Sequence, residues 1–164
     1  MDFRYLYTSF EGRINRKPFW IASLILFVVA LVISFVVLVP ITAANATMGM
    51  LAGLILSLAL LYPGAALGVK RLHDRGKSGL LMAVFIAPGV VSQLCGLLGI
   101  SGSYQIIAGE SIHMPNALGW ILNLATFGVA IWALVTLGFL KGTSGANRYG
   151  PDPLMGEARE VVPG

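Results

Sequence analysis

The sequence predicts an all-α polytopic membrane protein, with four transmembrane helices and a short interfacial helix at the N-terminus. Hydrophobic residues make up 57% of the 164 residues and charged residues only 11%, whereas a soluble domain carries about 25% charged residues. Residues 18–69, 78–109 and 111–140 contain no Asp, Glu, Lys or Arg. A transmembrane helix needs roughly 20 apolar residues, so the first stretch can hold two spans and the others one each. This composition excludes a soluble enzyme, a nucleic-acid-binding domain and a disulfide-stapled secreted fold.

Helix-starting and helix-ending residues set the boundaries of the spans. Asn15 can cap the first span, Pro40 ends it, and Gly142 stops the fourth. The spans are expected at about residues 18–39, 48–69, 79–98 and 118–140. Together they form a single membrane domain over residues 1–153, followed by a cytoplasmic tail at residues 154–164.

The basic residues predict one orientation in the membrane. All 11 Lys and Arg fall before the first span, between the second and third, or after the fourth, which is one side of the membrane. The connections on the other side carry Glu110 as their only charge. Cytoplasmic loops carry the excess of Lys and Arg, so both termini are expected in the cytoplasm.

An apolar helical face precedes the first span. The residues that recur at steps of three and four are Phe3, Leu6, Tyr7, Phe10 and Ile14. This is the spacing of one face of a helix, so we expect a short helix lying on the bilayer surface. A frayed tail is the alternative, because Gly12 weakens the helix.

Two Pro-Gly pairs interrupt the expected spans, Pro63-Gly64 in the second and Pro88-Gly89 in the third. Counted from the cytoplasmic ends, both lie roughly 10–14 Å deep. Interrupted helices at matched depth can mark a substrate site in a transporter, although a transmembrane proline is usually only a kink. No Asp, Glu, Lys, Arg or His lies within any expected span, which argues against ion-coupled transport.

Small residues follow the second span at four-residue steps. They are Gly49, Gly53 and Ser57, and then Gly64 and Gly68. Such spacing lets helices approach closely in lipid. It indicates packing within one bundle, with a homo-oligomer interface as the alternative.

Three polar segments on the expected cytoplasmic side are too specific to be simple charged flanks. They are residues 10–20, 70–79 and 142–153. The residues expected to form a cytoplasmic polar network are His73, Asp74, Asn147 and Asp152, with Asp74 paired to Arg13 or Arg148. Adjacent residues on a loop do not converge readily on one ion, and no Cys, His or acidic cluster completes a metal site. Neither a metal nor a cofactor is therefore expected.

Together these segments resemble the domain of unknown function 805 family of uncharacterised bacterial inner-membrane proteins. The matching motifs are Gly-Arg-x-x-Arg-x-x-Phe-Trp at Gly12–Trp20, Arg-Leu-His-Asp…Ser-Gly at Arg71–Gly79, Pro88-Gly89, and Asn-Arg-Tyr-Gly-x-Asp-Pro at Asn147–Pro153. The resemblance covers about residues 3–153 and implies a four-span fold in the bacterial inner membrane, with no established activity. Two departures are Leu80, where family members often have Trp, and the long connection at residues 99–117.

Two functions from different classes fit these features. The first is a non-enzymatic membrane protein whose basic cytoplasmic face binds anionic lipid headgroups or a protein partner, since each cation beside an anionic leaflet contributes about 1 kcal/mol. The residues expected to make these contacts are Arg13, Arg16, Arg71, Lys77 and Arg148. The alternative is a small transporter or channel with its site at the paired Pro-Gly breaks. An enzyme acting on lipid-linked phosphates through His73 and Asp74 is the weakest alternative.

Overall fold

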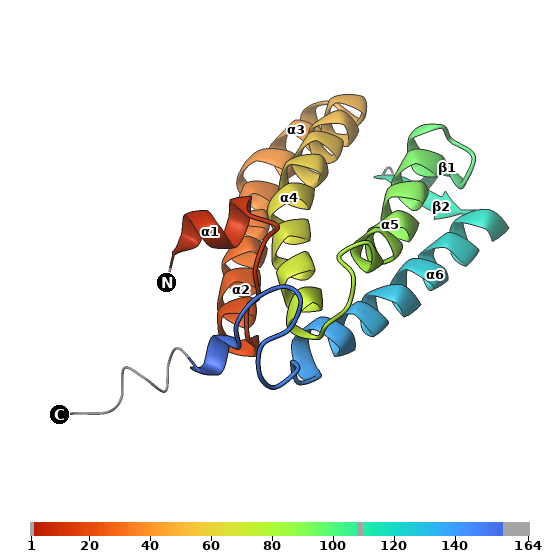
Figure 1. Ribbon diagram of the computed structural model, residues 1–164. Helices are drawn as coiled ribbons and strands as arrows, with labels where there is room; N and C mark the ends of the chain where they lie inside the picture. Colours follow the sequence, from red (N-terminus) through yellow and green to blue (C-terminus); the bar gives the residue numbers. More distant parts are fainter. Residues whose placement is uncertain (1, 108–109, 156–164) are drawn as a thin grey trace. The chain divides into compact units, whose positions relative to one another are not determined.

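The computed structural model describes residues 2–107 and 110–155, which fold into helices and one β-hairpin (Figure 1). The chain divides into two compact units. Unit 1 comprises Met1–Met82 and Thr136–Gly164, and unit 2 comprises Ala83–Val135. Unit 1 therefore holds all three polar segments of the sequence, whereas unit 2 holds most of the third and fourth predicted spans.

Unit 1 begins with a short helix, α1 (Phe3–Thr8), and continues into a long apolar helix. This long helix comprises α2 (Arg16–Ile33), a π-helical segment η1 (Ser34–Leu38) and α3 (Val39–Ala44). A second long helix, α4 (Ala46–Asp74), packs against it and runs back along it (Figure 1). The π-helical segment η2 (Val135–Phe139) begins at the end of unit 2 and leads into the C-terminal segment.

Among the residues that the structure describes, three helices are long and apolar enough to cross a membrane: Arg16–Ala44, Thr47–Asp74 and Ala117–Phe139. The expected third span is the shorter helix α5 (Leu81–Leu97) of 17 residues. At 1.5 Å per residue it covers about 25 Å, less than the ~30 Å hydrocarbon core of a bilayer. The described residues thus form a mostly helical membrane protein with three such long helices, and the fourth span stays a prediction.

Pro40 does not end the first long helix, contrary to the sequence prediction. The helix continues through Pro40 and ends at Ala44, with Asn45 directly after it. The Asn45 side chain caps the start of the next helix, α4. The π-helical η1 precedes the proline, and there Val39 N–H donates to the Ser34 carbonyl five residues earlier. A π turn rearranges the hydrogen-bond ladder where a proline ring would otherwise clash with the carbonyl four residues before it. The helix can therefore continue past the proline.

Two small residues of α4 lie at close contacts within unit 1. A Cβ atom at Gly49 would lie 2.7 Å from Thr42 Cα, and a Cβ atom at Gly68 would lie 2.8 Å from Met82 Cε. Gly53, in contrast, has open space around it. Packing within the chain thus accounts for Gly49 and Gly68, and a homo-oligomer interface stays a prediction.

Unit 2 contains a β-hairpin that the all-α prediction missed. Strands β1 (Gly102–Ile107) and β2 (Glu110–Pro115) pair antiparallel and connect α5 to α6 (Ala117–Leu134). The strands are only six residues long, and no Asn-Gly or Asp-Gly pair, the strongest short-range hairpin signal, separates them. After the hairpin Asn116 caps α6, because its Oδ1 accepts from Gly119 N–H at 3.0 Å.

The N-terminal helix α1 is shorter than the predicted apolar face and is anchored to α4. The chain turns at Gly12, where φ is +80°. The Lys70 ammonium of α4 is buried and donates to three backbone carbonyls of the N-terminal segment, at 2.5 to 2.7 Å. They belong to Tyr5, Leu6 and Ser9. The last carbonyls of a helix have no partner within it, so this lysine satisfies the end of α1 and holds it against α4.

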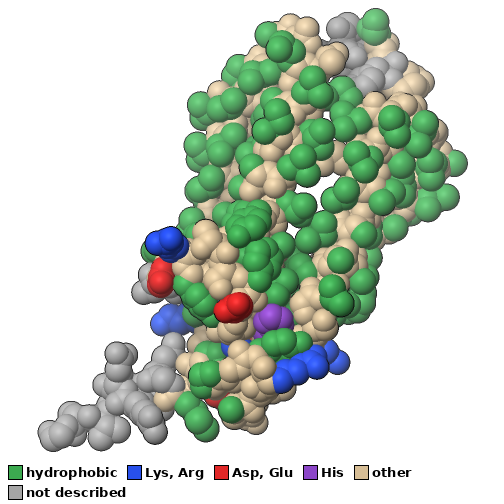
Figure 2. All heavy atoms as spheres, turned by 45° about the horizontal axis from the view of Figure 1, so that its top comes forward, with side chains coloured by type: hydrophobic (Ala, Val, Ile, Leu, Met, Phe, Trp, Pro, Cys, Tyr) green, Lys and Arg blue, Asp and Glu red, His purple; other side chains and the backbone are tan. Residues whose placement is uncertain are grey.

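The charged side chains of unit 1 gather where its helices meet the terminal segments (Figure 2). We call this region the basic end and define it as residues 2–20, 70–79 and 139–155. Away from it, apolar side chains of α2 and η1 are exposed, among them Leu24, Phe27 and Phe35. A continuous exposed apolar surface of this kind marks contact with a membrane.

We expect Lys70→Met to release α1 from α4. Methionine keeps the apolar stem but leaves the three carbonyls without their donor, and each buried unsatisfied group costs about 1–3 kcal/mol. Deuterium exchange of the purified protein should therefore rise about tenfold or more at residues 3–8. Lys77→Met, at an exposed lysine, is the control and should leave this exchange unchanged. Equal exchange in the Lys70 variant and the unmodified protein would contradict the anchoring role.

Candidate functional site

A buried carboxylate joins the first two polar segments at the basic end. The sequence analysis expected Asp74 on a loop. In the structure Asp74 instead lies in the last turn of α4, three residues after Arg71. Its Oδ1 accepts from Arg13 Nη2 at 3.1 Å, and its Oδ2 accepts from Arg71 Nη1. The exposed fractions of these side chains are 1% for Arg13, 0% for Arg71 and 5% for Asp74. Two guanidinium groups thus share one carboxylate inside the protein.

The Arg13 guanidinium also holds the third polar segment. Its Nη1 donates to the Gly145 carbonyl at 2.8 Å, and its Nη2 donates to the Thr143 carbonyl at 2.7 Å. Gly142 lies so close to Asp74 that a Cβ atom there would collide with the carboxylate. The chain after η2 can therefore lie against the end of α4 because residue 142 is glycine and Arg13 supplies the donors.

Side chains of the first two segments cap the end of η2. Thr136 O accepts from Arg75, Leu137 O and Leu140 O from Arg71, Gly138 O from Trp20, and Phe139 O from Arg16. The Arg71 Nε bond to Leu137 O measures 2.7 Å and the Trp20 Nε1 bond to Gly138 O measures 3.1 Å. The last carbonyls of a helix lack partners within it, and cations there also oppose the negative end of the helix dipole. The three arginines and Trp20 therefore supply donors that the helix cannot provide itself.

His73 and Tyr149 stack face to face and join the second and third segments. Their ring centroids lie 3.8 Å apart, with 6° between the ring planes. His73 Nδ1 lies 3.2 Å from the Gly12 carbonyl, and Asn147 Nδ2 donates to the His73 carbonyl at 3.0 Å. These contacts engage the imidazole in the fold. Within residues 2–107 and 110–155, no group of three His, Cys, Asp or Glu side chains is placed to hold a metal ion.

Asp152 holds the turn of the third segment. Its Oδ2 accepts from Gly145 N–H at 2.8 Å, and its Oδ1 accepts from Leu154 N–H at 3.0 Å. Both hydrogen bonds lower the pKa of Asp152 below its ordinary value, and the bond from Leu154 has the larger effect. They do so because they stabilise the charged carboxylate. Asp152 is therefore ionised at neutral pH, and both of its oxygens are occupied.

Two of the five residues expected to bind headgroups lie inside the fold. Arg13 and Arg71 are buried, and their donors go to Asp74 and to backbone carbonyls. A guanidinium group already committed in this way has little capacity left for a lipid. We therefore revise the assignment of Arg13 and Arg71 from headgroup contacts to internal ties.

The other three expected contact residues, Arg16, Lys77 and Arg148, are exposed. Arg148 was one of two expected partners of Asp74, but its guanidinium instead lies over the Tyr149 ring, 4.7 Å from the centroid. Arg16 makes one hydrogen bond, to the Phe139 carbonyl at 3.3 Å. These three side chains keep donors available to solvent.

Lys70, Thr143 and Tyr149 belong to this site, although the sequence analysis assigned no individual role to any of them. A lysine at the end of an apolar run looks like a charged flank, and only the fold shows its ammonium turned toward α1. Thr143 Oγ1 donates to the Asp74 carbonyl at 3.0 Å. For Tyr149 the available signal was an aromatic residue inside the third polar segment.

The two Pro-Gly pairs lie within continuous helices, Pro63-Gly64 in α4 and Pro88-Gly89 in α5. They fall in different units. Neither proline ends its helix. The paired site stays a prediction.

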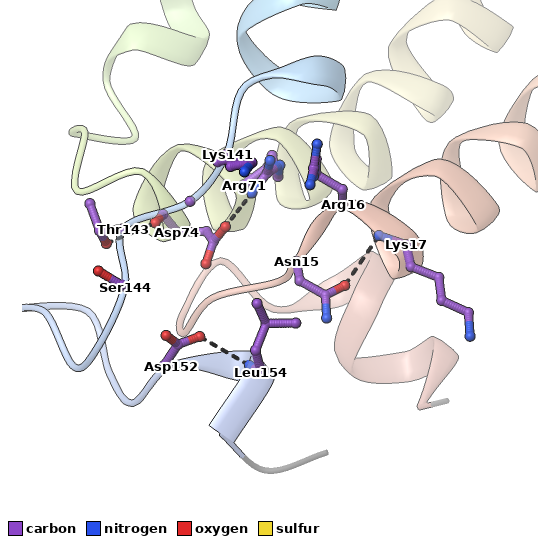
Figure 3. A pocket seen from close by; sticks show the side chains of 11 residues that line it. Asn15, Arg16, Lys17, Arg71, Asp74, Lys141, Thr143, Ser144, Asp152 and Leu154 are labelled. Carbon is purple, nitrogen blue, oxygen red and sulfur yellow. Dashed lines mark hydrogen bonds and ion pairs between the residues drawn. The ribbon is translucent and has the colours of Figure 1, made fainter. Parts of the chain in front are cut away.

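A cavity of about 580 Å³ lies at the basic end of unit 1 (Figure 3). It is bounded by the start of α2 and by the segment that follows η2. The residues that line it are Asn15, Arg16, Lys17, Arg71, Asp74, Lys141, Gly142, Thr143, Ser144, Asp152 and Leu154. Volumes of roughly 300–1,000 Å³ are typical of small-molecule sites.

We expect Asp74→Asn to destabilise unit 1 strongly. The substitution preserves size but leaves two buried guanidinium groups without a counter-charge, and removing one partner of a buried pair costs about 3–5 kcal/mol. The unfolding midpoint of the purified protein, followed by tryptophan fluorescence, should fall clearly. Asp152→Asn serves as the control with a smaller expected loss, because that carboxylate accepts only backbone hydrogen bonds near the surface. An Asp74 variant as stable as the unmodified protein would show that the shared carboxylate is dispensable.

Comparison with known proteins identifies the family. The chain matches the family described as Protein of unknown function (DUF805) over residues 7–151. It is 32% identical to the uncharacterized protein YiiR of Escherichia coli strain K12 over 146 residues, which cover 88% of this chain and 85% of that protein. It is 29% identical to inner membrane protein YhaI of the same strain over 150 residues, which cover 92% of this chain and 90% of that protein. No solved structure matches the chain significantly. Because the family match includes nearly all of the three polar segments, the chain belongs to the DUF805 family.

Proposed function

We propose that this chain is a non-enzymatic protein of the bacterial inner membrane whose basic end faces the cytoplasm and binds anionic lipid headgroups. The observation that carries the proposal is a set of exposed cations with no acidic partner. They are Arg4, Arg16, Lys17, Lys77, Lys141 and Arg148. Both ion pairs found among residues 2–107 and 110–155 involve Asp74 and the buried Arg13 and Arg71. The exposed cations therefore keep their charge for an external anion.

The cytoplasmic orientation follows from where these charges lie. Lys and Arg accumulate in the loops on the cytoplasmic side of membrane proteins, and within residues 2–107 and 110–155 the basic end carries all the Lys and Arg of unit 1. The cytoplasmic leaflet is rich in anionic lipids, and each cation near its surface contributes about 1 kcal/mol. Several exposed cations on one face are enough to favour anionic over neutral lipids.

A non-enzymatic role fits the state of the two residues that an enzyme would need. The His73 ring stacks on Tyr149, and its Nδ1 lies against the Gly12 carbonyl. The Asp74 carboxylate is shared by two buried guanidinium groups. Groups engaged in this way support the fold. An acidic segment of a protein partner would use the same exposed cations as a headgroup, and co-purification from native membranes would distinguish the two ligands.

Removing three exposed cations should weaken lipid binding. We expect the Arg16→Gln/Lys77→Gln/Arg148→Gln variant to bind phosphatidylglycerol vesicles about 100-fold more weakly, from the loss of about 1 kcal/mol per cation. Native mass spectrometry should show fewer anionic lipids retained on the purified variant. The matched control, Arg16→Lys/Lys77→Arg/Arg148→Lys, keeps every charge and should bind as the unmodified protein does. Unchanged retention in the glutamine variant would refute headgroup binding by this face.

A small transporter or channel is the second candidate, because polar side chains lie beside the Pro88-Gly89 pair within unit 2. Thr126 Oγ1 is buried and has no hydrogen-bond partner among the described residues. The Thr126 methyl group would lie 4.0 Å from a Cβ atom at Gly89. On the same helices Ser92 Oγ lies 3.5 Å from Asn123 Oδ1. Uncharged polar groups of this kind inside a membrane can line a solute path.

If the Pro88-Gly89 pair forms part of a solute site within unit 2, Pro88→Ala should abolish a flux that the unmodified protein supports in liposomes. Alanine restores the backbone N–H and straightens the helix. Pro151→Ala, at the basic end, is the control and should leave flux intact. Transport that persists in the Pro88→Ala variant would eliminate this candidate.

A further inference from the structure

The cavity of about 580 Å³ at the basic end carries more positive charge than its own carboxylates can neutralise. Arg16, Lys17, Arg71 and Lys141 line it together with Asp74 and Asp152. Both carboxylates are already satisfied, Asp74 by two arginines and Asp152 by two backbone amides. The cations nevertheless lie close together. Arg16 is near enough to Arg71 for the two positive charges to repel each other.

Three side chains that line the cavity keep hydrogen-bond donors free: Arg16, Lys141 and Ser144. Lys141 and Ser144 belong to the segment after η2, and neither side chain has a hydrogen bond or ion pair to any described residue. Arg16, at the start of α2, uses one donor for the Phe139 carbonyl and keeps the others. In Figure 3 the ends of Arg16, Arg71 and Lys141 gather at one wall, whereas Lys17 extends away from the cavity.

This arrangement suits an anion with several oxygen atoms. A phosphate group offers oxygens in several directions and can accept from a guanidinium fork, an ammonium and a hydroxyl group at once. A carboxylate offers only two oxygens on one side. An anion beside Arg16 and Arg71 would also relieve the repulsion between these two positive charges.

The position of the cavity favours a lipid as the source of that phosphate. Its first wall is the start of α2, the helix that continues as the apolar span Arg16–Ala44. One turn into this helix Trp20 is partly exposed and donates to the Gly138 carbonyl. Tryptophan side chains with one apolar and one polar end lie at the level of the lipid headgroups. A headgroup can therefore reach the cavity while its acyl chains stay beside the span.

We propose that this cavity is a discrete phosphate site that holds one anionic phospholipid headgroup between Arg16, Lys141 and Ser144. The proposal rests on the proposed function and makes it specific, because one bound lipid is distinguished from general attraction to the basic end. Arg71 contributes charge to the wall, while its hydrogen bonds stay within the fold.

The test is native mass spectrometry of the full-length chain in detergent, titrated with phosphatidylglycerol, oleate or phosphatidylcholine. Two cavity variants are used: Lys141→Gln removes one free cation, and Ser144→Trp fills the space without changing charge. The matched control, Lys77→Gln/Arg148→Gln, removes two exposed cations that do not line the cavity. The unfolding midpoint of each variant identifies any that fail to fold, and the two independent cavity variants guard against such a failure.

We expect the unmodified protein to retain one phosphatidylglycerol most tightly, and each cavity variant to bind this first lipid about tenfold or more weakly, the effect of losing one charged hydrogen bond. The control should keep the first lipid and lose only weaker ones. Equal losses in cavity and control variants would overturn the discrete site while leaving the proposed function standing, whereas no anionic lipid on any protein would overturn both.

Two further arms identify the ligand. Oleate retained as tightly as phosphatidylglycerol, with the same dependence on Lys141, would overturn phosphate recognition in favour of any anionic lipid. Glycerol 3-phosphate that displaces the first lipid only in proteins with Lys141 and Ser144 intact would support the phosphate site. Glycerol 3-phosphate binding without any lipid binding would overturn the lipid as its source.

Discussion

The fold of unit 1 depends on how the carbonyl groups at the end of η2 are satisfied. A helix leaves its last carbonyls without partners, and near a bilayer there is little water to replace them. Four side chains from the first two polar segments, Arg16, Trp20, Arg71 and Arg75, donate to these carbonyls. Since these side chains come from α2 and from the end of α4, capping one helix end fixes three helical elements against each other.

The buried Asp74 completes this arrangement at a cost. Removing two guanidinium groups and a carboxylate from water is expensive, and a buried ion pair is weak evidence of stability. The geometry offers another reason for its presence. Each of the three polar segments supplies a part: Arg13 comes from the first, Arg71 and Asp74 from the second, and the carbonyls of residues 143 and 145 from the third. A slip of any segment by one residue would leave a buried charge unpaired, so the cluster selects one register.

Lys70 supplies the hydrogen-bond donors for the end of α1, as the arginines and Trp20 do for the end of η2. Its ammonium satisfies the end of a helix of six residues, which is too short to be stable alone in water. The helix α1 is thus held by a specific polar contact with α4 as well as by its apolar residues. The basic residues of this chain accordingly divide into two classes, internal donors and exposed charges.

The sequence predicts well where a property is summed over many residues. Long uncharged stretches reveal the apolar helices. The sequence also predicts that Asn15 caps the first of them, and in the structure the Asn15 side chain accepts a hydrogen bond from Lys17 N–H. The structural effect of a single residue is harder to predict when that residue is compatible with two local conformations. Pro40 normally stops a helix, and only the preceding π turn lets this helix continue. The hairpin at residues 102–115 carries no turn signal of its own within the described residues. Periodicity could not show that α4 continues to Asp74, because its last turn is charged.

The division of the basic residues also could not be inferred from the sequence. Arg13, Lys70 and Arg71 have the composition of any charged flank, and their role emerges only when distant carbonyls and Asp74 come within hydrogen-bond distance. This division changes the basis of the lipid binding that we propose. Counting all 11 cations as attraction to the leaflet overstates it, because a guanidinium group already committed to backbone carbonyls gains little from a headgroup. The attraction must come from the exposed cations, and those that share a concave surface can act on one phosphate together. In the lipid binding that we propose, selectivity for one lipid therefore depends on the few cations around the cavity more than on the total charge of the chain.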